Sequence, residues 1–184
     1  ELESAIAITA LLARRVGFSV PGPKGFFDLG DSGRASVYPF LPGDPIDLGE
    51  VPDRRGLAGD IGRVMATVHN RDVALADEAG LPSYDADACR TRRLADLDRA
   101  ATTGRVPTSL LTRWEQALED VTLWRFAPAL VHGALSGDAL LVTFDDDDAA
   151  SGRVRGVVGW EHAQVSDPAE DFAAVVDQAS PEVV

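Results

Sequence analysis

The ten residues HGALSGDALL, numbers 132–141, lie where the sequence changes from helical to extended patterning. Within and after them, the apolar run at residues 139–144 predicts a strand. Residues 145–152 are rich in Asp, Ser and Gly and predict a turn, and the valine-rich residues 153–160 predict the strand that returns. Residues 129–132 indicate a short buried strand upstream. We therefore expect a glycine-containing loop that leads into a β-hairpin.

Three helices are predicted upstream of this loop. Residues 54–69 give the clearest one, because their apolar residues recur at the three- and four-residue spacing of a single helix face. Residues 85–101 and 108–125 show the same spacing. Trp114 and Trp124 follow it within the last of these helices. We therefore expect both tryptophans in the core.

The two ends of the chain complete an α+β pattern. Residues 1–15 predict a helix, and residues 25–29 and 34–41 predict two short strands around a Gly-Asp-Ser-Gly turn. The sequence Asp-Pro-Ala-Glu at residues 167–170 predicts the start of a last helix, with Asp167 as its N-terminal cap. The predicted order is helix, two strands, three helices, hairpin and helix, without an internal repeat.

The composition indicates an acidic globular protein. Apolar residues make up 45% of the chain, and 17 Lys and Arg against 30 Asp and Glu give a net charge of −13. Such a surface repels nucleic acids and anionic lipids, so we expect neither as a partner. Cys89 is the only cysteine, which excludes an internal disulfide, and we expect a cytoplasmic protein. Because the sequence does not start with Met, we also expect it to begin within a longer protein.

Several segments together resemble the aminoglycoside and macrolide phosphotransferases. Residues 132–141 resemble the family's catalytic loop, H-G-D-x-x-x-x-N before an apolar strand. Residues 156–163 (GVVGWEHA) and 166–173 (SDPAEDFA) are similar to its G-V-I-D-W-x-x-A and G-D-P-x-x-D-L-A patterns. Residues 37–43 (VYPFLPG) look like its hinge, and residues 64–69 (VMATVH) resemble its helix that ends in Leu-His.

The resemblance implies a kinase-like fold of two lobes. Residues 1–43 would form part of an N-terminal lobe with the hinge, and residues 44–184 a mainly helical C-terminal lobe that carries the hairpin. The hinge residues that would meet a nucleotide, through backbone groups, are Val37, Tyr38, Phe40 and Leu41. The resemblance also implies structural roles for His132, Asp167 and Asp171, of which Asp171 matches the aspartate that supports the catalytic loop.

Three positions depart from the family pattern. Ala134 replaces the aspartate that acts as the base, Ala139 replaces the asparagine that holds Mg²⁺, and Gly159 replaces the aspartate that holds Mg²⁺. Phosphoryl transfer depends on these groups, and on a lysine and a Gly-rich loop that would precede Glu1. We expect the three positions to line one cleft that faces the hinge.

The sequence thus predicts a degenerate phosphotransferase-like protein, a pseudokinase, that acts as a binding or scaffolding module. Its partner would be a protein or a small molecule, and no cofactor is predicted. Two alternatives stay open. In one, the protein transfers phosphate from ATP or GTP with Mg²⁺ to a hydroxylated acceptor such as an aminoglycoside or macrolide, and Glu161 or Asp138 supplies the missing metal ligand. In the other it is an unrelated α+β binding module, in which His132 and Gly159 would not be neighbours.

Overall fold

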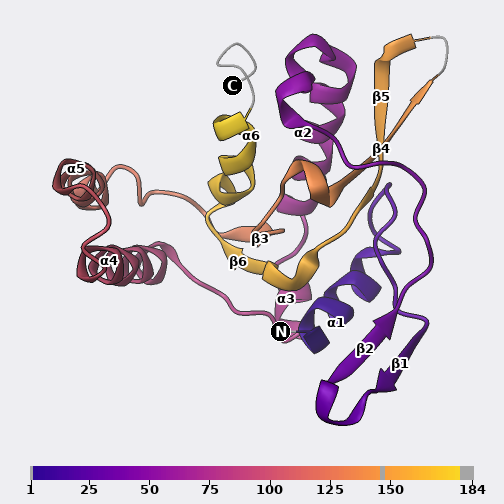
Figure 1. Ribbon diagram of the computed structural model, residues 1–184, viewed down its shortest axis with the longest axis horizontal. Coiled ribbons are helices and arrows are strands. Elements are labelled where there is room, and N and C mark those ends of the chain that lie inside the picture. Colours follow the sequence, from indigo (N-terminus) through magenta and orange to yellow (C-terminus); the bar gives the residue numbers. More distant parts are fainter. Residues whose placement is uncertain (1, 146–147, 179–184) are drawn as a thin grey trace.

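The computed structural model describes residues 2–145 and 148–178 and has the α+β composition that the sequence predicts. The helices are α1 (Leu2–Leu12), α2 (Arg55–His69), α3 (Ala74–Glu78), α4 (Ala86–Thr102), α5 (Thr108–Glu119) and α6 (Ala173–Gln178); the strands are β1 (Gly25–Asp28), β2 (Arg34–Val37), β3 (Ala129–Val131), β4 (Leu140–Asp145), β5 (Asp148–Val157) and β6 (Gln164–Ser166). In Figure 1, α4 and α5 project to one side and the β1–β2 pair to the other, with α2 and the β4–β5 hairpin above the middle. Among the described residues, no helix is both long and apolar enough to cross a membrane.

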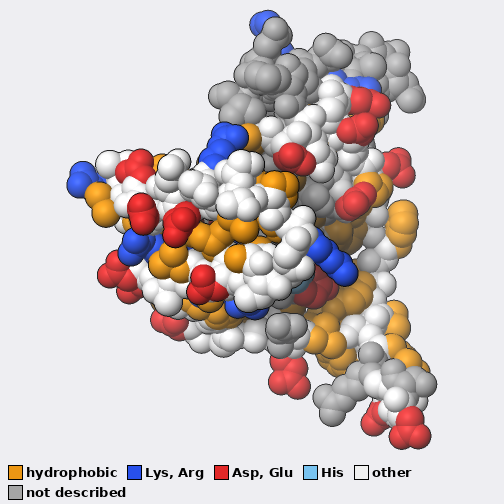
Figure 2. Space-filling view, turned by 60° about the vertical axis from the view of Figure 1, so that its left-hand side comes forward, with side chains coloured by type: hydrophobic (Ala, Val, Ile, Leu, Met, Phe, Trp, Pro, Cys, Tyr) orange, Lys and Arg blue, Asp and Glu red, His pale blue; other side chains and the backbone are white. Residues whose placement is uncertain are grey.

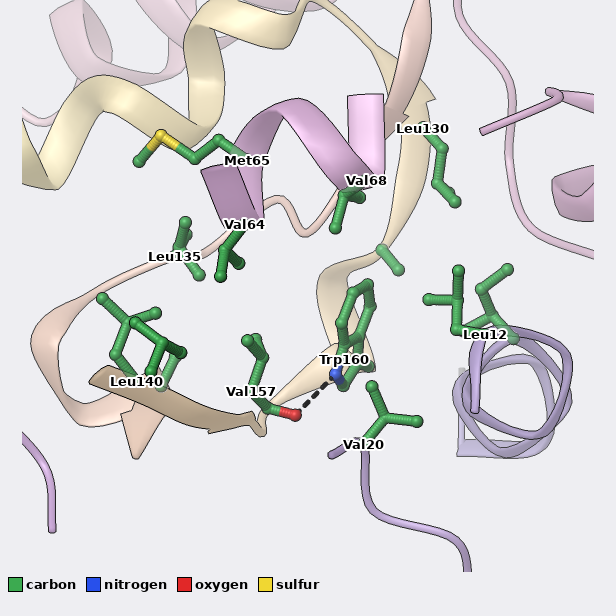
Figure 3. Close-up of a cluster of buried hydrophobic side chains, with 14 of the residues drawn as sticks. Leu12, Val20, Val64, Met65, Val68, Leu130, Leu135, Leu140, Val157 and Trp160 are labelled. Carbon is green, nitrogen blue, oxygen red and sulfur yellow. Dashed lines mark hydrogen bonds between the residues drawn. The ribbon is translucent and has the colours of Figure 1, made fainter. Parts of the chain in front are cut away.

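Helix α2 supplies much of the core and confirms the helix predicted at residues 54–69. Its buried residues are Leu57, Ile61, Val64, Met65 and Val68. They pack against β5 and β3, and each buried side chain of this size contributes about 1.5–3 kcal/mol. Figure 3 shows Trp160 between Val68, Val157 and Leu12. The indole is 2% exposed and its Nε1 donates to the Val157 carbonyl at 2.9 Å, so its polar atom is satisfied inside the core.

The β4–β5 hairpin follows the predicted loop, but its second strand differs from the prediction. Leu140 pairs with Val157, and the antiparallel register shifts twice along the hairpin. The return strand runs from Asp148 to Val157 rather than over residues 153–160. It ends there because Gly159 has a left-handed backbone, φ 81°, and the chain turns into a 3₁₀ helix at Trp160–His162. Residues 146–147 of the predicted turn lie outside the described residues.

Two short strands, one before the loop and one after the hairpin, pair with each other. Strand β3 lies where residues 129–132 predict a strand, and it pairs antiparallel with β6. The sequence does not predict β6, which is only three residues long. This pairing joins the segment before the loop to the segment after the hairpin, so the loop is held from both sides.

The helix and the strands of the N-terminal segment end earlier than predicted. Helix α1 ends at Leu12 rather than at residue 15, and it packs on Trp160–His162 and on α3. Strands β1 and β2 form an antiparallel pair, and β2 ends at Val37 rather than at residue 41. Pro39 has no backbone N–H to continue the ladder. Residues 38–41 therefore lie outside the sheet.

Helices α4 and α5 pack on each other at the side of the molecule, and the core placement of Trp114 is wrong. That side chain is 41% exposed, and α5 has no buried residue. Helix α5 also ends at Glu119, not at residue 125, and Trp124 is half-buried with its Nε1 donating to the Leu118 carbonyl at 3.2 Å. Figure 2 shows apolar side chains gathered over these helices. The helical period is present, but the face that it marks is open to solvent.

Candidate functional site

The predicted loop is fixed by one buried carboxylate. Asp171, 1% exposed, lies in the 3₁₀ helix Pro168–Phe172. Its Oδ2 accepts from the backbone N–H of His132 at 3.0 Å, and its Oδ1 accepts from that of Gly133 at 2.8 Å. The Nε2 of His69, at the end of α2, donates to Oδ2 at 2.9 Å. Asp171 thus ties the loop to the last residue of the main core helix.

His132 joins the same loop to the end of the hairpin. Its ring is 2% exposed, its Nε2 donates to the Val158 carbonyl at 2.8 Å, and it meets Trp160 edge-on at a centroid distance of 4.8 Å. Burial lowers the pKa of His132, and the nearby Val158 carbonyl, Asp171 and Glu161 oppose this only in part. Within the described chain its Nδ1 has no hydrogen-bond partner. His132 is therefore a neutral imidazole that is packed in the core.

The loop leaves no room for a side chain at its second residue. Gly133 has φ 80°, and a Cβ built on it would clash with the carbonyl oxygen of His162. The position therefore requires glycine for two independent reasons, backbone conformation and space. The consequence is that residues 132–133 press directly against the segment that follows Gly159.

Asp167 caps the 3₁₀ helix that carries Asp171, although the rest of the capping box differs from the prediction. Asp167 accepts from the Ala169 N–H at 2.9 Å. Glu170 accepts from Ser166 Oγ at 2.9 Å and pairs with Arg93 at 3.0 Å. These partners lie on β6 and α4, so Glu170 connects the 3₁₀ helix to two other elements instead of completing the capping box.

A cavity of about 500 Å³ lies between α1, residues 38–45 and the end of the hairpin. Its lining includes Gly159 and the hinge residues Tyr38, Phe40 and Leu41, but not Val37. Segments more than a hundred residues apart in sequence therefore meet here. Gly159 lies next to the loop as well, because a Cβ on it would lie 3.8 Å from His132 Cε1. His132 and Gly159 are thus neighbours, which removes the basis of the unrelated-module alternative.

The other two departing positions are not in the lining of this cavity. Ala139 is buried, and its carbonyl accepts from the Val158 N–H at 2.9 Å. Ala134 is exposed at the surface, directly after Gly133. The prediction that all three line a single cleft is therefore too broad, because only Gly159 does so. Their functional roles stay predictions.

The side chains present do not fit a catalytic Mg²⁺. Alanine and glycine at positions 139 and 159 offer no side-chain oxygen, and Mg²⁺ needs oxygen ligands in a near-octahedral arrangement. Glu161 is an acid beside Gly159, with its Oε2 3.9 Å from a Cβ built on that glycine. Within the described parts of the chain, no group of three or more His, Cys, Asp or Glu could hold a metal. One carboxylate does not replace the paired ligands.

Sequence reasoning missed two features of this site. Asp44 and Thr9 line the cavity, although neither belongs to a recognisable motif. The partnership of His69 with Asp171 spans 102 positions. In the sequence, His69 is recognisable only as the last residue of the predicted helix, and this position does not indicate that it binds Asp171.

Comparisons with known proteins agree with this architecture. The model of the phosphotransferase enzyme family matches residues 1–183. The macrolide 2'-phosphotransferase MphH from Brachybacterium faecium, as apoenzyme, is 25% identical with a TM-score of 0.79, over 99% of this chain and 60% of that one. The GDP and kanamycin complex of APH(2")-IIia is 21% identical with a TM-score of 0.80, over 99% of this chain and 63% of that one.

Among curated proteins, the uncharacterized protein YcbJ of Bacillus subtilis (strain 168) is 26% identical over 148 residues, which is 74% of this chain and 46% of YcbJ. The chain thus spans less than two thirds of the length of each of these three relatives. The likeness confirms the predicted α+β, kinase-like fold.

Proposed function

This chain belongs to the phosphotransferase enzyme family, and we propose that it is a member that keeps the fold as a ligand-binding module without phosphoryl transfer. One observation carries the proposal: Ala134, Ala139 and Gly159 stand where the family patterns that this sequence resembles have the base and the two metal ligands. The loop that would present them is nevertheless held in place by Asp171. The protein thus combines an ordered loop with side chains that do no acid–base or metal chemistry.

Phosphoryl transfer places specific demands on the side chains of an enzyme. There is little covalent chemistry for the protein to perform, so the rate depends on positioning and on neutralising the charge of the transferring group. The methyl group of alanine and the hydrogen of glycine can neither take the proton of the hydroxyl that would be phosphorylated nor coordinate a cation. A base typically contributes about 10²–10⁴-fold to a rate, and the metal ligands act together with it as a unit.

The cavity supports binding in place of catalysis. Its hinge wall runs through Tyr38, Phe40 and Leu41, whose backbone amides and carbonyls form no backbone hydrogen bond within the described chain. Leu141 and Val158 also line the cavity. Free backbone groups and apolar side chains in one cavity suit the edge and faces of a flat heteroaromatic ring, as in a nucleoside.

In this proposal, residues 1–43 and 44–184 act as the two lobes that border the cavity, with the hinge between them. Helix α1 and the β1–β2 pair lie on one side of it, and the hairpin with α2 lies on the other. A small molecule bound there would contact both. We further place the protein in the cytoplasm, where nucleosides and nucleotides are abundant.

A working phosphotransferase is the second candidate. It is favoured by the relatives whose structures are described as complexes with GDP or with ATP and streptomycin, and by the carboxylate of Glu161 beside Gly159. In that case Glu161 would have to act as the main metal ligand, and ATP or GTP with Mg²⁺ would be the donor pair.

Calorimetric titration of the full-length protein with ATP and GTP, with and without Mg²⁺, separates the two. We expect Mg²⁺ to raise the affinity by less than about tenfold, because it offsets part of the phosphate charge in solution but no paired ligands hold it on the protein. The double variant Ala139→Asn with Gly159→Asp is the matched control and should acquire metal-dependent tightening. A tightening of tenfold or more in the unmodified protein would instead establish the second candidate.

A further inference from the structure

We propose that the cavity at the hinge selects an uncharged nucleoside-type ligand over its phosphorylated forms. The inference rests on the proposed function and names the ligand class of the same site. The inference comes from the negative charges around the cavity, which no metal ion at positions 139 and 159 would offset.

The charged side chains that line the cavity all carry the same sign. They are Asp44 and Glu161, and no Lys, Arg or His is among the described lining residues. Both are exposed acidic residues. The whole chain carries −13, so the wider field has the same sign.

Glu161 lines the same cavity as the hinge residues and lies beside Gly159. Its Oε2 is 3.9 Å from a Cβ built on that glycine. A ligand that places its ring on the hinge would have this carboxylate in the same cavity as any further groups that it carries. His132 is buried and donates its Nε2 proton to the Val158 carbonyl, so it does not offset the carboxylate.

A phosphate group is disfavoured at this place. Each phosphate monoester brings a charge of about −1.5 to −2 near neutral pH, and like charges a few ångströms apart repel even through a partly aqueous medium. With a metal held at positions 139 and 159 the repulsion would be cancelled, but alanine and glycine hold none. The ring and sugar of a nucleoside carry no such cost and still use the hinge backbone and the apolar walls.

The test is a binding series on the full-length protein in EDTA, with adenosine, guanosine, AMP, ADP and ATP. We expect the better of the two nucleosides to bind roughly tenfold or more tightly than ATP, with the affinity falling at each added phosphate. The difference should shrink as salt is raised, because screening weakens the repulsion.

Two isosteric variants localise the effect. Glu161→Gln should strengthen ATP binding several-fold and leave the nucleoside affinity unchanged, whereas Glu115→Gln, on the exposed side of α5, should change neither. Metal-free ATP binding as tight as nucleoside binding, or equal effects of the two variants, would overturn this inference and leave the proposed function standing. If no nucleoside or nucleotide bound at all, the proposed cavity function would fail, and this inference with it.

Discussion

The two sides of residues 132–139 differ in what their side chains accomplish. On the buried side, Asp171 satisfies two loop amides and His69, and His132 is packed and hydrogen-bonded. On the open side, Ala134 carries a single methyl group, and the neighbouring Gly159 carries none. The comparison teaches that the groups that hold this loop are separate from the positions that the resemblance assigns to the reaction, so the loop's geometry does not depend on the side chains at those positions.

The largest effect should come from removing the buried carboxylate. Asp171→Ala leaves two loop amides and the His69 imidazole without their acceptor in a dry environment. We expect the free energy of unfolding to fall by about 3–5 kcal/mol, measured by urea denaturation. The matched control is Asp138→Ala, an exposed acid in the same loop, which should cost less than about 0.5 kcal/mol. Equal losses in the two variants would show that Asp171 does not support the loop.

The second effect concerns the close approach at Gly133. Gly133→Ala combines φ 80° with a clash against the His162 carbonyl, so we expect a loss of about 2 kcal/mol or more. Gly62→Ala is the control: this glycine is exposed within α2, and a Cβ built on it would have nothing within 4 Å. That variant should gain about 0.5–1 kcal/mol from helix propensity. A harmless Gly133→Ala would contradict the packing described between the loop and residue 162.

The pH dependence of stability should report on His132. Burial lowers the pKa of His132 in the folded protein, so the unfolded chain binds the proton first as the pH falls. The stability from the neutral imidazole is complete above about pH 6.5, and it is lost below that value with a slope of at most about 1.4 kcal/mol per pH unit. Denaturation at pH 7, 6 and 5 should show a steeper decline for the wild type than for His132→Gln. Parallel curves would mean that the ring is protonated without cost.

The smallest effect is expected at Gly159. Its left-handed backbone is one that Asp adopts more readily than other non-glycine residues, and the nearest atom to a Cβ built on it would be 3.8 Å away. Gly159→Asp should therefore cost about 1 kcal/mol or less by thermal denaturation, in contrast to Gly133→Ala. A loss as large as that of Gly133→Ala would show that the backbone here no longer accommodates the aspartate.

Much of the fold can be predicted from the sequence where periodicity and burial coincide. Helix α2 is the clearest case, since its periodic residues are also its buried ones. Trp114 shows the limit, because the spacing marks an apolar face but does not say what covers it. The end of β5 depends on the left-handed turn at Gly159, and the three residues of β6 are ordered by their pairing with β3 rather than by local preference.

The candidate site could be predicted as positions but not as geometry. The resemblance places Asp171 near the loop, yet its bond to His69 joins residues 102 positions apart and leaves no local pattern. Nor does the sequence indicate that Ala134 is exposed while Ala139 is buried. Such distinctions follow from how the hairpin and loop pack, which only the tertiary structure fixes.

The most direct test of the central claim is phosphoryl transfer by the full-length protein and by its triple variant Ala134→Asp, Ala139→Asn and Gly159→Asp. Both would be assayed with ATP and GTP, Mg²⁺, and macrolide and aminoglycoside acceptors. We expect no turnover near the ordinary kinase range of about 1–100 s⁻¹ for the unmodified protein, and a gain of transfer in the triple variant. Turnover of the unmodified protein within that range would contradict this expectation.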